Sequence, residues 1–159
     1  MTDERTARPA MQAATPFDPH QAGPFMMRFG HGAFLGTRFR DAGEDWCELE
    51  QPWREDLVGQ PERDVLASGP ILSMMDMATS MAVWTRRGVF VPHVTLDLKV
   101  DYMQPATKGS VVIGRGECYK LTRTMSFVRG IAYEEALGMD DPIAHVTGAF
   151  MLLHGEEAG

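Results

Sequence analysis

Residues 68–88 read SGPILSMMDMATSMAVWTRRG and predict one long helix. Ser68 offers a capping hydroxyl at the start, and Pro70 suits the first turn of a helix. An arginine pair at positions 86–87 favours the negative end of the helix dipole, and Gly88 supplies a C-terminal cap. The run between these ends lacks the broad polar face of a surface helix. We therefore expect the rest of the chain to enclose this helix almost completely.

The hydrophobic period changes from 3.6 to 2 after the helix, over residues 93–103. Such alternation predicts a half-exposed strand, with Val94, Leu96, Leu98, Val100 and Tyr102 on one face and Thr95, Asp97, Lys99 and Asp101 on the other. Further strand-like runs follow at 110–120, 124–134 and 143–153. Consecutive strands joined by short turns should pair antiparallel.

The segments before the helix carry weaker patterns. Residues 17–29 suggest a short helix or turn that ends at Gly30 and Gly32. Alternation and turn residues predict the remaining elements as two short strands at 33–39 and 45–51 around a turn at 41–44, followed by a charged, irregular loop at 53–66.

This order of elements predicts a single α+β domain over residues 17–154, in which a curved antiparallel sheet wraps around one long central helix. Residues 1–16 and 155–159 are polar and aperiodic, so we expect them to be flexible tails. A sheet of this kind leaves an outer face and edges exposed. Dimerisation would cover them, so we expect a homodimer or homotetramer.

Composition restricts the partners and the compartment. The 159 residues fit one domain, and the net charge of −7 argues against nucleic-acid or anionic-membrane binding. Cys47 and Cys118 lie in apolar strand-like runs without metal spacing, and we interpret them as reduced core thiols. The five histidines are scattered, so no metal site is predicted. The first residues lack the apolar core of a signal peptide, which favours a cytoplasmic protein.

The helix and the strand after it carry a family motif. The helix begins with ASGP at residues 67–70, an acid follows at Asp76, and the strand reads TLDLKVDYMQPA at 95–106. These features resemble the hotdog-fold acyl-CoA thioesterases of the phenylacetate-pathway (PaaI-like) type. Their pattern is a His-Gly-Gly start, a helix acid about two turns in, and a strand T-x-x-L-x-x-x-[FY]-[LM]-x-P-A. The resemblance covers roughly residues 25–153 and implies the hotdog fold.

The resemblance implies that Asp76 is the catalytic carboxylate. It is the only charged residue between Gly69 and Arg86, and a carboxylate held near a thioester acts as a general base or nucleophile. Thr79 and Ser80 follow on the same helical face. The residues alone also allow a second interpretation, in which Asp76, Thr79 and Ser80 form a thin solvated stripe.

Two further catalytic roles follow from the resemblance. The backbone amide of Gly69, or of Ser68 in the alternative alignment, would stabilise the oxyanion at the helix start. In the family, this amide and the helix acid of one site come from different subunits. Thr95 would position water or the carboxylate. Ser68 and Gly69 could also serve only as a helix cap, and Thr95 could be an ordinary β-branched strand residue.

The turn at Arg123 and Thr124 matches the place where relatives have a basic residue near the phosphates of CoA. Arg123 could bind a phosphate through two hydrogen bonds, or it could be a solvated turn charge. Arg86, Arg87 and Lys108 are further candidates for this role.

The predicted function is hydrolysis of an acyl-CoA thioester to a free acid and CoA, with no cofactor besides the CoA of the substrate. The chain has Ala67 or Ser68 where the family has histidine, and the family's Asn or Gln has only Gln60 or Glu62 as candidates. These departures favour an alternative, a non-catalytic protein that binds acyl-CoA or another small ligand. A third possibility is a hotdog hydratase or dehydratase, which would need a paired histidine and acid at the site, and the sequence shows no such pair near Asp76. The helix methionines, Met74, Met75, Met77 and Met81, predict adaptable core or the lining of an acyl tunnel.

Overall fold

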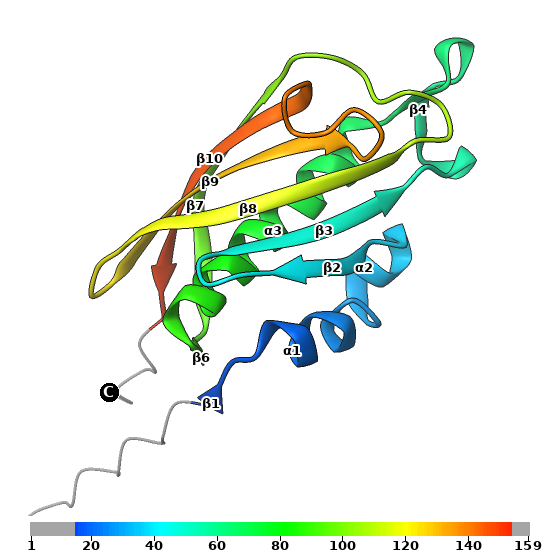
Figure 1. Cartoon of the computed structure of the whole chain (residues 1–159). Coiled ribbons are helices and arrows are strands. Elements are labelled where there is room, and N and C mark those ends of the chain that lie inside the picture. The colour runs from blue at the N-terminus through cyan, green and yellow to red at the C-terminus, as the bar shows by residue number, and fades with distance from the viewer. Residues whose placement is uncertain (1–14, 154–159) are drawn as a thin grey trace, which may run out of the picture.

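The computed structural model describes residues 15–153 (Figure 1). The predicted C-terminal tail, 155–159, lies outside the described residues, as does most of the predicted N-terminal tail, 1–16. The last two residues of that N-terminal segment form β1 (Thr15–Pro16), which pairs antiparallel with β6 (Val89–Phe90) just after the long helix.

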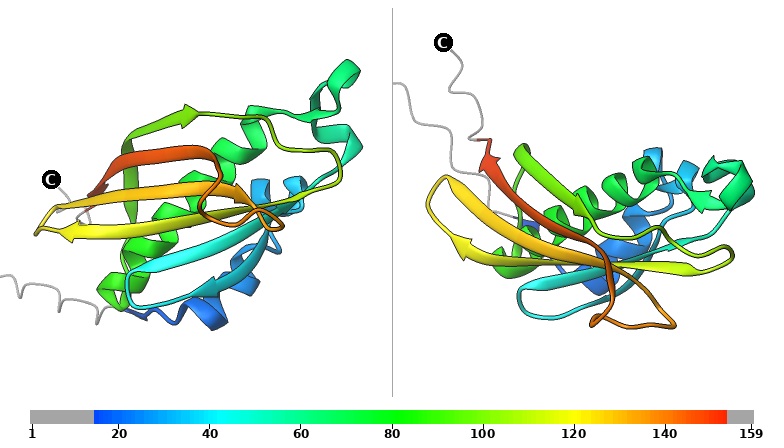
Figure 2. Two further views of the ribbon diagram at one scale, coloured as in Figure 1. Left: turned by 45° about the horizontal axis from the view of Figure 1, so that its top comes forward. Right: turned by 90° about the horizontal axis from the view of Figure 1, so that it is seen from above.

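The main sheet is antiparallel and has six strands in the order β2-β3-β8-β9-β10-β7. The strands are β2 (Arg38–Ala42), β3 (Trp46–Pro52), β7 (His93–Tyr102), β8 (Val111–Leu121), β9 (Met125–Glu134) and β10 (Pro142–Leu152). The sheet curves around the long helix α3 (Ser68–Arg87), as Figures 1 and 2 show. The predicted architecture of one central helix in a curved antiparallel sheet is therefore confirmed.

Helix α3 is enclosed as its apolar sequence predicts. Its buried residues are Pro70, Ile71, Met74, Met75, Ala78, Thr79, Met81, Ala82, Val83 and Trp84. Glycines in the sheet let its backbone come close to the helix, and Gly116 shows this most clearly. A Cβ added there would lie 2.6 Å from the backbone nitrogen of Thr79. The helix is thus packed against strand backbone at this point, and only glycine leaves room for it.

The two ends of α3 differ in how well the sequence predicts them. Gly88 has a left-handed backbone (φ 68°) and caps the C-terminus as expected. Ser68 does not cap the N-terminus: it is the first helical residue, and the N-cap is Ala67. The Ala67 N–H donates to the carbonyl oxygen of Leu57 at 2.9 Å. The entry to the helix is therefore held by a backbone contact with the preceding loop, which no local pattern reveals.

The segment before the sheet forms two short helices, α1 (Pro19–Met26) and α2 (Gly30–Leu35). The prediction that Gly30 ends the helical segment is wrong, because Gly30 begins α2. The first half of the strand expected at 33–39 is wrong as well. Gly36, with φ 75°, ends α2, and the chain becomes extended only at Arg38. Short glycine-rich helices carry too few turns for a helical period to show.

The predicted loop at 53–66 contains short regular elements. These are the 3-10 turns η1 (Glu55–Leu57) and η2 (Pro61–Arg63) and the strand pair β4 (Val58–Gln60) and β5 (Val65–Leu66). This small hairpin leads directly into the start of α3, and Figure 1 places it at one end of the helix.

Both cysteines are buried and free. Burial raises the pKa of the Cys47 thiol to about 12, with smaller contributions from Glu48 and Asp41, so this thiol stays protonated at neutral pH. Within residues 15–153, no helix combines the length and the apolar character needed to cross a membrane.

Candidate active site

Asp76 and Thr95 lie together, as the sequence predicts. The Thr95 hydroxyl on β7 donates a hydrogen bond of 2.9 Å to Oδ1 of Asp76 on α3. Oδ2 of Asp76 has no hydrogen-bond partner within residues 15–153, and the side chain is only partly buried. One carboxylate oxygen is thus held in place while the other is free to accept a proton or to attack a carbonyl carbon.

A bulge in β7 brings Thr95 to the helix side of the sheet. Opposite β10, Asp97 pairs with Ala149 and Thr95 pairs with Phe150, so Leu96 is an extra residue. An extra residue reverses the facing of a strand. The uniform alternation predicted for residues 93–103 is therefore wrong.

The packing on either side of the bulge agrees with this reversal. Thr95 contacts α3, while Leu96 is 52% exposed. Beyond the bulge, Leu98 and Val100 pack against the core. Had the alternation continued through residue 96, Thr95 would point away from Asp76.

A second polar pair lies one helical turn from the first. Ser80 Oγ and His93 Nε2 are 2.5 Å apart, and the His93 ring stacks on Trp84 with ring centres 4.7 Å apart. Burial lowers the pKa of His93 to about 4, and the charge of Arg87 adds to this effect. The histidine is therefore neutral at physiological pH and joins β7 to α3.

Thr79 does not belong to the polar seam between α3 and β7. It is fully buried, and its hydroxyl donates to the carbonyl oxygen of Met75 at 2.8 Å. The alternative interpretation of Asp76, Thr79 and Ser80 as one solvated stripe is therefore wrong. Asp76 and Ser80 instead each bond a side chain of β7.

The N-terminus of α3 presents two backbone amides. The first amides of a helix have no acceptor within the helix, and Pro70 has no N–H to offer. The Ala67 N–H is used by Leu57, which leaves Ser68 and Gly69. Neither amide has an acceptor among the described residues. Gly69 is exposed, and a Cβ added there would meet no atom within 4 Å. The two amides can therefore bind an oxyanion that approaches from outside the chain.

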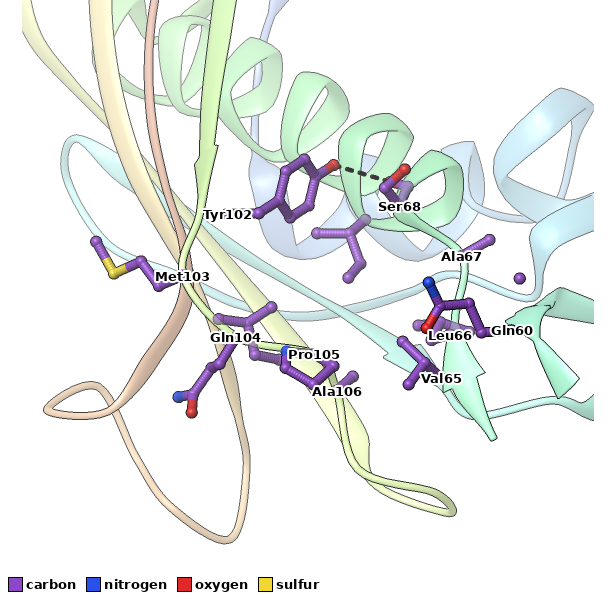
Figure 3. A pocket seen from close by; sticks show the side chains of 13 residues that line it. Gln60, Val65, Leu66, Ala67, Ser68, Tyr102, Met103, Gln104, Pro105 and Ala106 are labelled. Atoms are coloured by element: carbon purple, nitrogen blue, oxygen red, sulfur yellow. Dashed lines mark hydrogen bonds between the residues drawn. The ribbon is translucent and has the colours of Figure 1, made fainter. Parts of the chain in front are cut away.

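A pocket of about 500 Å³ lies beside these amides (Figure 3). Ser68 and Ile71 line it from α3, and Tyr102 lines it from the end of β7. The Tyr102 hydroxyl donates to the Ser68 carbonyl oxygen at 3.0 Å and thereby fixes this wall of the pocket. Gln60 also lines the pocket, beside Ala67 in Figure 3, whereas Glu62 does not. We call this cavity the N-terminal pocket.

A smaller pocket of about 190 Å³ lies beside Asp76. Its walls come from α3 and from the α1–α2 segment, and we call it the α2 pocket. The lining residues are Met27, His31, Gly32, Leu35, Thr37, Ser73, Met74, Asp76 and Met77. Of the four methionines considered for an acyl tunnel, Met74 and Met77 line this pocket, while Met75 and Met81 are fully buried.

The amides and the carboxylate of one chain are too far apart to act on the same thioester. A helix rises about 1.5 Å per residue, so Gly69 lies roughly 10 Å along the axis from Asp76. The amides lie at one end of α3, and Asp76 lies near its middle, beside the edge strand β7.

Arg123 is the basic side chain that remains free in the turn between β8 and β9. No described residue pairs with its guanidinium. The other three candidates for the phosphates are engaged: Arg86 donates to the carbonyl oxygen of Cys118, Arg87 donates to that of Thr122, and Lys108 pairs with Asp64. Thr124 is partly buried, and its carbonyl oxygen accepts from Leu152. The turn lies near the C-terminal end of α3, away from the N-terminal pocket.

Among the described residues, no group of three or more histidine, cysteine or acidic side chains could hold a metal ion.

Comparisons with known proteins place this arrangement in a family. The family model of the thioesterase superfamily matches residues 65–137, which include α3, β7 and β8. The structure of a protein from Pseudomonas aeruginosa is 35% identical, with 84% of this chain and 98% of that chain covered and a TM-score of 0.74. The chain belongs to the thioesterase superfamily. A search of the curated proteins found no significant match.

Other solved structures share the fold. A thioesterase from Haemophilus influenzae is 18% identical, with 94% of this chain and 100% of that chain covered and a TM-score of 0.76. The PaaI protein of the phenylacetic acid degradation operon of E. coli is 12% identical, with 86% and 93% covered and a TM-score of 0.73. At these identities the likeness concerns the fold, and it confirms the predicted hotdog arrangement.

The sequence pointed to most of these residues but missed some that line the pockets. His31 and Ser73 were not singled out, although they lie 3.3 Å apart beside Asp76. Ser73 is three residues before Asp76, so its position on the same helical face could have been read from the sequence. His31 comes from a segment 42 residues earlier, and only the packing of α2 on α3 brings it there.

Proposed function

We propose that this thioesterase-superfamily protein hydrolyses acyl-CoA thioesters to a free acid and CoA. The observation that carries the proposal is the Thr95–Asp76 hydrogen bond, which holds one carboxylate oxygen and leaves the other free beside a pocket. The N-terminal pocket, with the free amides of Ser68 and Gly69, supplies the second requirement of acyl transfer, a donor for the oxyanion.

The proposed site lies between two protomers. The spacing of roughly 10 Å between Gly69 and Asp76 along one helix supports a site that takes its amide and its carboxylate from different chains. In a homodimer or homotetramer, Asp76 of one protomer would face the amides of its partner. The edge position of β7, which carries Thr95, supports contact with a second copy at this side of the sheet.

In the proposed reaction, Oδ2 of Asp76 takes a proton from a water molecule. The water oxygen then attacks the thioester carbonyl carbon, and the carbonyl oxygen becomes an oxyanion bound by the amide of Gly69 or Ser68. When the carbon–sulfur bond breaks, the CoA thiolate leaves and takes up the proton. Alternatively, Asp76 attacks the carbonyl carbon directly, and water hydrolyses the resulting anhydride. The residues are the same in both routes.

Arg123 is proposed to bind a phosphate of CoA, with Thr124 beside it. The support is that Arg123 is exposed and free, whereas the other basic candidates are engaged. No cofactor is needed, because CoA is part of the substrate. We further propose a cytoplasmic location, where acyl-CoA is available.

One observation favours the alternative of a non-catalytic acyl-CoA binding protein. Ala67 is the N-cap of α3, and its methyl group cannot hydrogen-bond to a substrate or to the carboxylate of a partner. In the alignment that keeps the family's distance to Asp76, Ala67 stands where the family pattern has histidine, and in the other alignment Ser68 does. Both functions would use the same pockets, so they differ only in turnover.

The test is release of the CoA thiol from a panel of acyl-CoAs by the parental protein, Asp76→Asn and the control Asp140→Asn. Asn keeps an acceptor for the Thr95 hydroxyl but cannot take a proton. We expect turnover to fall by about 10²–10⁴-fold in Asp76→Asn. Asp140 is exposed in the turn between β9 and β10, so its variant should keep parental activity.

Melting temperatures of the three proteins check that they fold equally well. Parental turnover by a well-folded Asp76→Asn would overturn the assignment of Asp76. Tight acyl-CoA binding without any turnover by the parental protein would instead favour the binding protein.

A further inference from the structure

The α2 pocket has a polar mouth and an apolar floor. His31, Ser73 and Asp76 stand at the mouth, where all three are at least partly exposed. The floor is made of the buried side chains of Met27, Leu35, Met74 and Thr37. A molecule that enters the pocket therefore passes the free carboxylate before it reaches an apolar interior.

The floor has no free proton donor for a polar ligand. Thr37 is the only polar residue there, and its hydroxyl donates to Oε1 of Gln51 at 2.8 Å. Gln51 is itself fully buried, and its amide donates to the carbonyl oxygen of Leu35 at 2.9 Å. This local network is already satisfied, so a buried polar group on the ligand would lose its hydrogen bonds to water without replacement.

We infer that the α2 pocket receives the acyl group of the thioester and selects compact, uncharged acyl groups of about six carbons or a single ring. The inference rests on the proposed function for the position of the thioester beside Asp76. It goes further because it assigns the acyl group to a cavity built by the α1–α2 segment, and it names the class of substrate.

The size limit follows from the volume. A cavity of about 150 Å³ lined by apolar side chains accommodates benzene, so 190 Å³ leaves room for a ring or a short chain. A long acyl chain would need several times that space. The methionines at the floor adapt to the shape of the group but do not lengthen the pocket, because Met27 and Met74 are buried against the core.

The charge limit follows from the lining. No lysine or arginine lines the pocket, and Asp76 stands at its mouth. An acyl group with a terminal carboxylate, such as succinyl, would have to pass this carboxylate and then lie unpaired in the apolar floor. Such substrates should be excluded.

Gly32 is a position where an added side chain would narrow the pocket. It lies on α2 with an ordinary backbone conformation, and a Cβ added there would meet Met27 Sδ at 3.4 Å, which is normal van der Waals contact. Gly32→Val should therefore shorten the space for the acyl group, and Gly32→Ala should do so less. Met27→Ala removes part of the floor and should lengthen the space for the acyl group. Ala33→Val is the matched control, since Ala33 is the next residue of α2, is exposed and does not line the pocket.

The experiment measures binding with hexyl-CoA and dodecyl-CoA, thioethers that cannot be hydrolysed. We expect the parental protein to bind hexyl-CoA more tightly than dodecyl-CoA or CoA itself. Gly32→Val should weaken hexyl-CoA binding roughly tenfold, as expected when about two methylene groups lose an apolar site, and should leave CoA binding unchanged. Met27→Ala should improve dodecyl-CoA relative to hexyl-CoA, and Ala33→Val should match the parental protein.

Equal affinity of Gly32→Val and the parental protein for hexyl-CoA would overturn the inference, as would parental preference for dodecyl-CoA. If Gly32→Val melts at a lower temperature, Gly32→Ala provides the same comparison with a smaller change. Hydrolysis of hexanoyl-CoA is measured separately. Size-selective binding without hydrolysis would overturn the proposed function and leave the acyl site standing. Hydrolysis that is insensitive to Gly32→Val and Met27→Ala would overturn the acyl site and leave the proposed function standing.

Discussion

The Thr95 hydroxyl donates a 2.9 Å hydrogen bond to Oδ1 of Asp76 across 19 residues of chain. The bond joins the edge strand β7 to the helix that the sheet encloses. It depends on the bulge at Leu96, because an uninterrupted alternation would turn Thr95 to the outer face. A single extra residue in β7 thus decides which hydroxyl the carboxylate meets.

Removal of the Thr95 hydroxyl should lower turnover while the fold is kept. Thr95→Val has nearly the same shape but cannot donate, so Asp76 loses the bond that orients it. A hydrogen bond to a charged group contributes about 1.5–3 kcal/mol, which corresponds to a loss of roughly ten- to a hundredfold in kcat. Thr95→Ser keeps the hydroxyl and should stay near the parental rate. Equal rates for the valine and serine variants would contradict this role.

The edge of the sheet at β7 should associate with a second copy. Val94, Leu96, Tyr102 and Met103 on or next to β7 are large apolar side chains that are exposed in one chain. Light scattering should therefore give two or four times the chain mass of 17.7 kDa at micromolar concentration. Leu96→Glu should shift the protein toward monomer, whereas Leu137→Glu, at a similarly exposed leucine in the β9–β10 turn, should not. A parental monomer would also exclude the proposed shared site.

Arg123→Ala should raise KM for acyl-CoA and leave kcat nearly unchanged. A phosphate contact is equally strong in the ground state and in the transition state, so its loss weakens binding only. The expected increase in KM is roughly tenfold or more. Lys108→Ala is the control, because Lys108 already pairs with Asp64 at 3.0 Å. Unchanged kinetics in Arg123→Ala would make Arg123 a solvated turn residue.

His93 should make the folded protein less stable at mildly acidic pH. Burial, assisted by Arg87, lowers its pKa from 6.5 to about 4, so the unfolded chain binds a proton first as the pH falls. The contribution of the neutral histidine to stability is fully present above pH 6.5 and is lost as the pH falls toward 4. His93→Gln can still bond Ser80 but does not titrate. Its melting temperature should therefore fall less than that of the parental protein over this range, and parallel curves would contradict the assignment.

Gly116→Ala should destabilise the protein. The added methyl group would lie 2.6 Å from the backbone nitrogen of Thr79, and helix α3 cannot move away without losing its contacts in the sheet. Overpacking of this kind typically destabilises by about 1–3 kcal/mol, measurable as a lower midpoint in urea. Gly69→Ala serves as a stability control, since a Cβ there meets open space. A parental midpoint for Gly116→Ala would mean that the helix has more room than the structure shows.

Local chemistry was enough to predict α3 and the four strands that follow it. The apolar run of residues 71–84 has no face suited to water, and Gly88 ends it with the left-handed conformation that glycine adopts easily. The same segment isolates Asp76 as its only charge before Arg86. Each of these features depends on residues within a few positions of one another, and the structure confirms the elements that they predict.

The sequence by itself determined the enclosed helix and the antiparallel strands. It also singled out Asp76, the acid that matches the family pattern. Only the tertiary structure decided what surrounds that acid. The bulge that turns Thr95 inward depends on the register between β7 and β10, and His31 reaches the α2 pocket through the packing of α2 on α3. Ala67 rather than Ser68 is the N-cap of α3, and the Ala67 N–H donates to the carbonyl oxygen of Leu57. These contacts join residues that are distant in the chain, and their free energy depends on packing between elements rather than on local preference.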